Sequence, residues 1–369
     1  MHKMFVKNAV ALTALVVASP MVLAQQGSNV QLYGIVDAAI RHTNNEGAGG
    51  DSSLTKMIGG GMSQSRWGIN VTEDLGGGLK AIANLESRLE LDSGSLPANA
   101  PYFQQSWMGL QGNAGRLTMG RQYNVLFDLV TTTYSSFPYS PYMEAYKPEI
   151  GMALGARSNN MLKYTAEVGA IRGALQYSFD EGAPGRSGRT VGGYLRYSAD
   201  GLSVGGAYQN LKLFNTAEMD AMTVGGSYRS GPLYVNLGYG RNKIKGHPGE
   251  VQAANAGIAA MWSGEVNGGF LRGAATKRDM VKIGFGYQFT PQVNAGVHYY
   301  HAKQSGSPVA ADNGKAHFLV AVADYAFSKR TDAYFGVDHT KVKGGANLAL
   351  GTNGARDRTG ITAGIRHRF

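Results

Sequence analysis

The chain contains no cysteine among its 369 residues. The absence of cysteine excludes a disulfide scaffold, a zinc ribbon and catalysis by a thiol. Its mean hydropathy is slightly negative, which excludes a bundle of membrane-spanning helices. Apolar residues still make up 43% of the chain, a share too high for an intrinsically disordered protein.

Glycine and tyrosine are the residues present in excess. The 53 glycines are about twice the usual share of roughly 7%, and they do not recur at every third position as in collagen. The 20 tyrosines suit strands, and glycine suits the tight turns between them. The composition therefore favours many short strands joined by turns.

The N-terminal segment has the pattern of an export signal. Lys3 and Lys7 give it a positive start, an apolar run follows over Ala9–Ala18, and small residues stand near its end. The run is shorter than the roughly 20 residues that a membrane-spanning helix needs. We expect residues 1–24 to be a cleaved signal peptide. Cleavage would leave one domain over residues 25–369 with a formal charge of +8, because the two lysines are the only charged residues removed from a chain of +10.

Apolar and polar side chains alternate along the rest of the chain. Val30 and Leu32, for example, alternate with Gln31, and Asp37 and Arg41 continue the polar face. The same alternation appears over residues 30–40, 67–71, 79–85, 175–179, 233–239, 281–289 and 361–369. Such a period of two indicates strands with one apolar and one polar face.

Short and long connections alternate between the expected strands. Turn signals such as Gly76-Gly77-Gly78 and Asp200-Gly201 mark tight turns. Long, polar and glycine-rich connections fall at residues 42–62, 121–157, 243–276 and 342–357. No long segment has a convincing helical period, and this disfavours a fold of βαβ units.

Two architectures fit strands with one apolar and one polar face: a soluble sandwich and a transmembrane barrel. The expected strands are close to the 9–11 residues that cross a bilayer, and many end in tyrosine or phenylalanine, as an interfacial girdle requires. Glu86 and Arg88 also lie near the centre of a polar face, where they need water or a partner. At roughly 20 residues per strand and connection, we expect an all-β, antiparallel transmembrane barrel of about sixteen strands.

Several segments, in order along the chain, carry a resemblance to a known family. They are Val30–Asp37, Ser65–Gly68, Thr72–Ala81, Leu85–Ser87, Leu117–Gln122, Ser328–Thr331 and Gly364–Phe369. Together they resemble the general porins of β-proteobacteria, the Gram-negative family that includes the neisserial porins. The resemblance implies a sixteen-stranded barrel in the cell outer membrane, a homotrimer, and a third loop folded into the lumen. It also implies passive diffusion of small hydrophilic solutes and inorganic ions, in contact with outer-membrane lipid and lipopolysaccharide.

The third long connection, residues 122–156, is the expected constriction loop. It is rich in aromatic residues and contains the acids Asp128, Glu144 and Glu149. Connections of this length are usually functional or disordered, and the aromatic residues argue against disorder. A surface-exposed loop is the alternative reading.

Charged residues at the constriction set the selectivity of a hydrated pore. By resemblance, Arg66 and Arg157 stand where the family has constriction arginines, and Glu86 matches a family acid. Some anion-selective members carry a further arginine on the fourth strand, where this chain has glutamine, and Arg88 is the candidate substitute. Glu144 and Glu149 would face these arginines across the pore.

Three further charged residues have two readings each. Asp37, Arg41 and Lys80 occupy alternate strand positions on the polar face, which would line the lumen. They either line the pore or form ion pairs that only hold the wall in shape. The other basic residues at alternate positions that would face the lumen are Arg172, Arg196, Lys163, Lys282, Arg366 and Arg368. The net charge of +8 after processing predicts a preference for anions.

The leading function is therefore a general diffusion porin. The alternatives are a channel specific for one class of anion and a structural or adhesive outer-membrane protein. We expect no enzyme, because no catalytic motif stands out, and no cofactor. We also expect no metal site: His298 and His301 lie three apart on a strand and so point to opposite faces. Export and the lack of a clustered basic segment argue against nucleic acid.

Overall fold

The structure is a computed structural model. It describes residues 28–97, 101–136, 155–180, 187–213, 217–261, 273–348, 350 and 354–369. The expected signal peptide, and the expected pore residues Glu144 and Glu149, lie outside the described residues.

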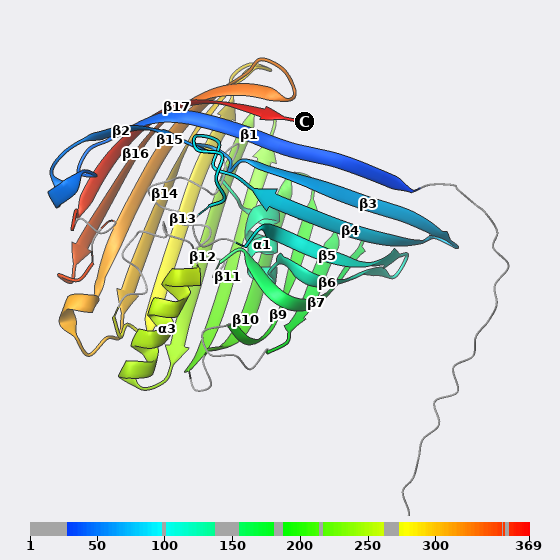
Figure 1. Cartoon of the computed structure of the whole chain (residues 1–369), viewed down its shortest axis with the longest axis horizontal. Helices are drawn as coiled ribbons and strands as arrows, with labels where there is room; N and C mark the ends of the chain where they lie inside the picture. The colour runs from blue at the N-terminus through cyan, green and yellow to red at the C-terminus, as the bar shows by residue number, and fades with distance from the viewer. Residues whose placement is uncertain are drawn as a thin grey trace, which may run out of the picture.

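The described chain forms one antiparallel sheet that closes on itself (Figure 1). Its strands are β1 (Asn29–Thr43), β2 (Leu54–Ile58), β3 (Arg66–Gly76), β4 (Leu79–Arg88), β5 (Phe103–Gly112), β6 (Gly115–Tyr123), β7 (Arg157–Val168), β8 (Ile171–Ser178), β9 (Ser187–Ala199), β10 (Leu202–Leu213), β11 (Ala217–Ser230), β12 (Leu233–Lys245), β13 (Lys277–Gln288), β14 (Val293–Ser305), β15 (Gly314–Ala326), β16 (Thr331–Gly344) and β17 (Asp357–Arg368). Closure comes from β1, whose Asp37 pairs with Arg366 of β17.

The seventeen segments occupy sixteen positions around the barrel. One half of β1 pairs with β2, as Ala39 with Ile58, and its other half pairs with β3, as Ile35 with Arg66. The segments β2 and β3 thus share one wall position, interrupted by residues 59–65. The expectation of about sixteen antiparallel strands is confirmed. The expectation of one long connection over residues 42–62 is wrong, because β2 forms a hairpin with β1 inside it.

The two faces of the wall are inverted relative to a soluble protein. Leu32 is 60% exposed and Leu175 is 68% exposed on the outside, whereas Asp37 and Lys282 are fully buried on the inside. Each strand alternates between these environments because successive side chains point to opposite faces. The apolar faces therefore point away from the lumen, as the transmembrane barrel predicts.

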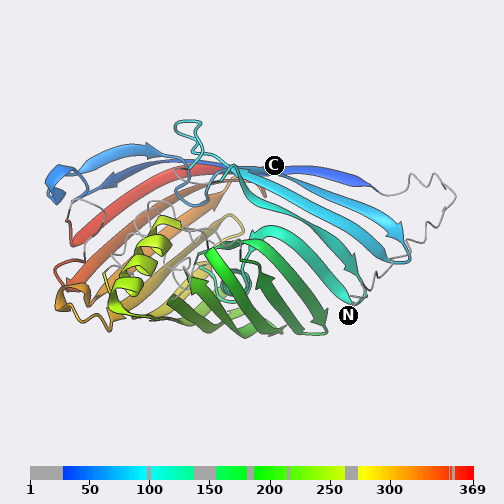
Figure 2. The ribbon, with the colours of Figure 1, turned by 60° about the horizontal axis from the view of Figure 1, so that its bottom comes forward.

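Short and long connections lie at opposite ends of the barrel (Figures 1 and 2). Tight turns join β3 to β4, β5 to β6, β7 to β8, β9 to β10 and β11 to β12. The opposite end carries β2, the short helices η1 (Ala48–Gly50) and η2 (Ala310–Asp312), and α3 (Pro248–Met261). We call these the turn end and the loop end.

Helices occur in two long connections for which the sequence predicted none. One is α3, and the other is α1 (Val125–Thr133), which opens the third connection. Five of the nine α1 residues are apolar and buried, and the three that are not buried, Asp128, Thr131 and Thr132, share one polar face at i, i+3 and i+4. That face covers little more than one turn, which is shorter than the window of about 11–18 residues over which a helical period is recognised. No described helix is long and apolar enough to span a membrane.

Candidate pore constriction

The helix α1 lies inside the barrel against the inner wall (Figure 1). Its N-terminus is capped by Asn124, whose Oδ1 accepts from the backbone N–H of Phe127 at 2.8 Å. It contacts β9, β10 and β11, and the wall has glycine at the points of closest approach. A Cβ at Gly205 would lie 2.6 Å from Leu129 Cδ1, and one at Gly225 would lie 2.6 Å from the Tyr134 ring. The expected inward fold of the third loop is therefore confirmed for its described first part.

Polar contacts fix both ends of α1 to the wall. Near its start, Lys163 Nζ of β7 donates to Asp128 Oδ2 at 2.7 Å and to the carbonyl oxygen of Tyr123 at 2.8 Å. Beyond its end, the Tyr234 hydroxyl donates to the carbonyl oxygen of Ser135 at 2.8 Å, and buried Lys282 donates to that of Tyr134. The expected pore residue Asp128 thus lies on the inner helix as the partner of a wall lysine.

Four charged side chains converge in the lumen beside α1. We call them the constriction cluster: Arg66 of β3, Glu86 and Arg88 of β4, and Arg157 at the start of β7. The carboxylate of Glu86 lies 3.3 Å from Arg157 Nη2 and 3.8 Å from Arg66 Nη1. Residues 66 and 88 are direct cross-strand partners. The structure thus brings together these four expected residues, which lie up to 91 positions apart.

Neutral groups orient the side chains of this cluster. Arg157 lies over the ring of Tyr123, with its guanidinium carbon 4.5 Å from the ring centroid. The side chain of Arg88 donates to Gln64 Oε1, and Arg66 Nε donates to the Gln64 carbonyl oxygen at 3.1 Å. Segment 59–65, which leaves the wall between β2 and β3, therefore holds two of the three arginines.

A fourth arginine, Arg121, lies near this cluster, and the sequence analysis did not identify it. Arg121 donates to Asn159 Oδ1 at 2.5 Å and lies close enough to Arg88 and Arg157 to interact with them electrostatically. The pairing of β6 with β7 shifts register between Gly120 and Gln122. Such a bulge disrupts the alternation on which parity depends, so counting alternate residues could not place Arg121.

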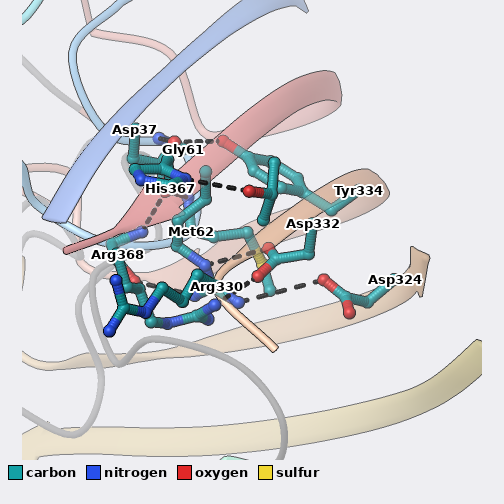
Figure 3. Close-up of polar contacts among 12 residues, drawn as sticks. Asp37, Gly61, Met62, Asp324, Arg330, Asp332, Tyr334, His367 and Arg368 are labelled. Atoms are coloured by element: carbon teal, nitrogen blue, oxygen red, sulfur yellow. Dashed lines mark hydrogen bonds and ion pairs between the residues drawn. The ribbon is translucent and has the colours of Figure 1, made fainter. Parts of the chain in front are cut away.

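Asp37 fixes segment 59–65 to the inner wall (Figure 3). Its carboxylate accepts from the backbone N–H groups of Gly61 and Met62 at 3.2 Å each, and of Ser63 at 2.6 Å. The hydroxyl of Tyr334 donates to the same carboxylate at 2.5 Å. Asp37, expected as either a pore residue or a wall residue, lies in a buried set of wall contacts.

A second group of charges adjoins Asp37 near the turn end (Figure 3). Arg366 Nε donates to Asp332 at 3.0 Å, its Nη1 donates to Ser63 Oγ at 2.8 Å, and its Nη2 lies 3.8 Å from Asp324. Arg368 also donates to Asp332, at 2.5 Å. These ion pairs link β15, β16 and β17 to the inward segment.

Arg41 and Lys80 lie apart from the constriction cluster. Arg41 forms a two-pronged pair with Asp338, at 2.6 and 2.9 Å, and donates to Thr362 at 2.7 Å. Lys80 is exposed, at the second position of β4 beside a tight turn. The contacts of Arg41 fit the alternative in which it forms ion pairs that hold the wall in shape. Lys80 lies at the rim of the turn end.

Within the described ranges, no group of three or more histidine and acidic residues has the arrangement of a metal site. His298 is buried on the lumen side, and His301 points outward with the exposed face of β14. The charged side chains described above contact one another, backbone groups or neutral side chains such as Gln64. The arrangement is that of a polar, charged passage through an apolar-faced barrel.

Comparison with known proteins gives consistent matches along this chain. A family model described as Gram-negative porin matches residues 11–345. The outer membrane porin protein 32 of Delftia acidovorans is 28% identical over 98% of this chain and 99% of its own. The major outer membrane protein P.IB of Neisseria meningitidis serogroup B is 29% identical over 47% of this chain and 50% of its own. The solved structure of the anion-selective porin from Comamonas acidovorans, 26% identical, matches 93% of this chain and all of its own with a TM-score of 0.70.

Proposed function

The chain belongs to the Gram-negative porin family, and from this premise we propose that its lumen passes small hydrophilic solutes and inorganic ions by passive diffusion, with a preference for anions. The protein is an outer-membrane porin with a water-filled channel. Family and fold point to a channel rather than an enzyme.

The constriction cluster is the observation that carries the proposed preference. Its three arginines and one glutamate have a formal charge of +2. Cationic groups in the low-dielectric wall of a narrow passage concentrate anions there. The anion-selective porin of Comamonas acidovorans supports the same sign of selectivity by similarity. The preference follows from charge close to the ion path rather than from the charge of the whole chain.

Three further features belong to this proposal. Residues 1–24 direct export and are removed, and residues 122–156 form the constriction loop. The mature chain assembles as a homotrimer; a trimer form is recorded for one fold neighbour, a Vibrio cholerae outer membrane protein. Its outer face contacts membrane lipid and lipopolysaccharide.

Conductance in a planar bilayer tests the proposal. We expect current steps in groups of three, a linear rise of current with salt concentration, and a reversal potential of anion-selective sign across a salt gradient. A cation-selective sign would contradict the preference. Saturable block by one anion, with phosphate and a dicarboxylate as probes, would favour a solute-specific channel, and no conductance would favour a structural or adhesive role.

A further inference from the structure

Trp107 of β5 presents an aromatic ring to the polar, inner side of the wall. The next residue, Met108, is 60% exposed on the lipid-facing side, so the alternation of a strand turns Trp107 toward the lumen, where it is partly exposed. Arg116 of β6 lies over this indole, with its guanidinium carbon 5.7 Å from the ring centroid. Such a contact uses one face of the guanidinium and leaves the N–H groups in its plane available to an anion.

Arg172 of β8 and Arg196 of β9 add two positive charges to the inner wall near Arg116. They are direct partners in the strand register, where Cβ atoms lie about 4.5–5.5 Å apart and like charges destabilise a sheet. Arg116 lies close enough to Arg172 for the two to repel each other. Arg196 donates to two neutral hydroxyls, those of Ser198 and Ser203, at 3.1 and 3.4 Å, and the Nε atoms of Arg172 and Arg196 are buried without a hydrogen-bond partner. We call Arg116, Arg172 and Arg196 the turn-side arginines.

The acids nearest to the turn-side arginines do not neutralise them. Asp128 of α1 interacts electrostatically with Arg116, but its carboxylate is already paired with Lys163 at 2.7 Å. Glu167 of β7 is the register partner of Arg172, but it is exposed at the rim of the turn end, and no ion pair joins these two described residues. The three arginines and Lys163 against these two acids leave a formal charge of +2, which stabilises an anion in the lumen beside them.

The turn-side arginines are separate from the constriction cluster. Arg116 and Arg172 are each the second residue of a strand that follows a tight turn. Arg121, which lies near the constriction cluster, is five residues further along β6, and five residues span about 17 Å of a strand. An anion that has passed the constriction toward the turn end therefore meets a second basic group, and this group has an aromatic ring beside it.

We propose that Trp107, Arg116 and Arg172 form a second anion site in the pore, on the turn-end side of the constriction, which retains carboxylates attached to an aromatic ring. The guanidinium groups bind the carboxylate, for which their planar fork of donors is suited. The exposed part of the indole contacts the ring of the solute in an offset or edge-to-face arrangement. Arg196 adds to the attraction through its charge. The inference deepens the anion preference proposed above and rests on it, because it names a class of anion that this pore favours.

Block of the single-channel current in potassium chloride by added carboxylates tests the site. The probes are benzoate and cyclohexanecarboxylate, which have the same charge and a ring of similar size, but only benzoate is flat and aromatic. We expect benzoate to reduce the current saturably, with a half-blocking concentration at least about threefold below that of cyclohexanecarboxylate, because aromatic pairs are favoured beyond the area they bury. Acetate, which has no ring, should block least.

Variants assign the two parts of the site. Trp107→Leu should remove the difference between the two ring acids, whereas Trp107→Phe, which keeps an aromatic ring, should retain most of it even if the leucine variant folds poorly. Arg116→Gln/Arg172→Gln should raise the half-blocking concentrations of both ring acids by about threefold or more. The controls are Trp67→Leu, which alternates with an inward arginine and so faces outward, and Arg189→Gln, at an exposed position of β9. Both should behave like the wild type.

Three results would overturn the proposal. They are equal block by the two ring acids in the wild type, an unchanged difference between them in Trp107→Leu, and equal effects of the double arginine variant and its control. The reversal potential, recorded on the same channels before any carboxylate is added, separates this site from the channel function. An anion-selective channel without a preference for benzoate contradicts only the second site, whereas a cation-selective channel contradicts the function proposed above.

Discussion

The backbone N–H of Ser63 donates to the carboxylate of Asp37 across 26 positions of sequence, at 2.6 Å. This bond joins the first barrel strand to a segment that has left the wall. Because Gln64 follows Ser63 and contacts both Arg66 and Arg88, a wall contact that lies outside the ion path positions two constriction arginines.

Replacing Asp37→Asn tests this relationship. Hydrogen bonds to a charged group are each worth about 1.5–3 kcal/mol, so we expect the free energy of unfolding to fall by about that much or more. Hydrogen exchange should also accelerate at the amides of residues 61–63. The exposed acid Asp51 supplies the control Asp51→Asn. Unchanged exchange at the three amides would show that the carboxylate does not hold the segment.

Arg157→Gln should reduce anion preference. One unit charge about 6 Å from an ion in water contributes about 0.7 kcal/mol, which corresponds to roughly threefold in local anion concentration. The reversal potential across a salt gradient should therefore shift toward zero, most at low salt, where screening is weak. Arg189→Gln, at an exposed position of β9, is the matched control. A shift of equal size in both variants would show that general charge, not the constriction, sets selectivity.

Glu86→Gln should change selectivity in the opposite direction. The substitution removes the carboxylate that lies 3.3 Å from Arg157 and 3.8 Å from Arg66, at nearly constant side-chain volume. By the same Coulomb argument, we expect the local anion concentration to rise and the local cation concentration to fall by roughly threefold each, so the anion-to-cation permeability ratio should rise. Glu218→Gln, on β11 beside Lys212, is the control. An unchanged ratio would place Glu86 outside the field that ions experience.

The pair of Arg41 and Asp338 is expected to affect stability without affecting selectivity. Both side chains are buried, and breaking such a pair from one side costs about 3–5 kcal/mol, because it leaves an uncompensated charge. Asp338→Asn should lower the unfolding temperature of the barrel in detergent. The double variant Arg41→Met/Asp338→Leu should recover much of the loss. If Asp338→Asn changes the reversal potential instead, Arg41 belongs to the pore.

We expect acid to weaken the contacts that Asp312 of η2 makes with other segments of the loop end. Burial raises the pKa of its carboxyl, but donors from Asn347, Ser307 and the backbone of Ala274 outweigh burial and hold this pKa below its usual range. Because the pKa is lowered on folding, the stabilisation is fully present above about pH 4 and is lost as pH falls through the folded pKa. Pepsin cleavage at the loop end should therefore rise below pH 4 in the wild type. In Asp312→Asn it should be high at every pH tested, and matching profiles would contradict the contact.

The sequence by itself determined the wall of this protein. Alternation such as Val30, Leu32 and Gln31 is a local property, since each side chain of a strand faces one of two environments. It therefore predicted the barrel, its approximate number of strands and the lumen side of Arg66, Glu86 and Arg88. The resemblance to porins added the inward third loop.

Only the tertiary structure decided how the interior is filled. The polar face of α1 spans little more than one turn, too short to establish a helical period in the sequence, and Arg121 lies in a bulge that breaks the count of alternate residues. Parity places Asp37 and Arg88 in the lumen alike, yet the first holds backbone amides and the second belongs to the constriction cluster. That difference depends on where residues 59–65 fold once β2 and β3 share one wall position. The sequence does not reveal this, because contacts between distant segments leave no periodic signal in it.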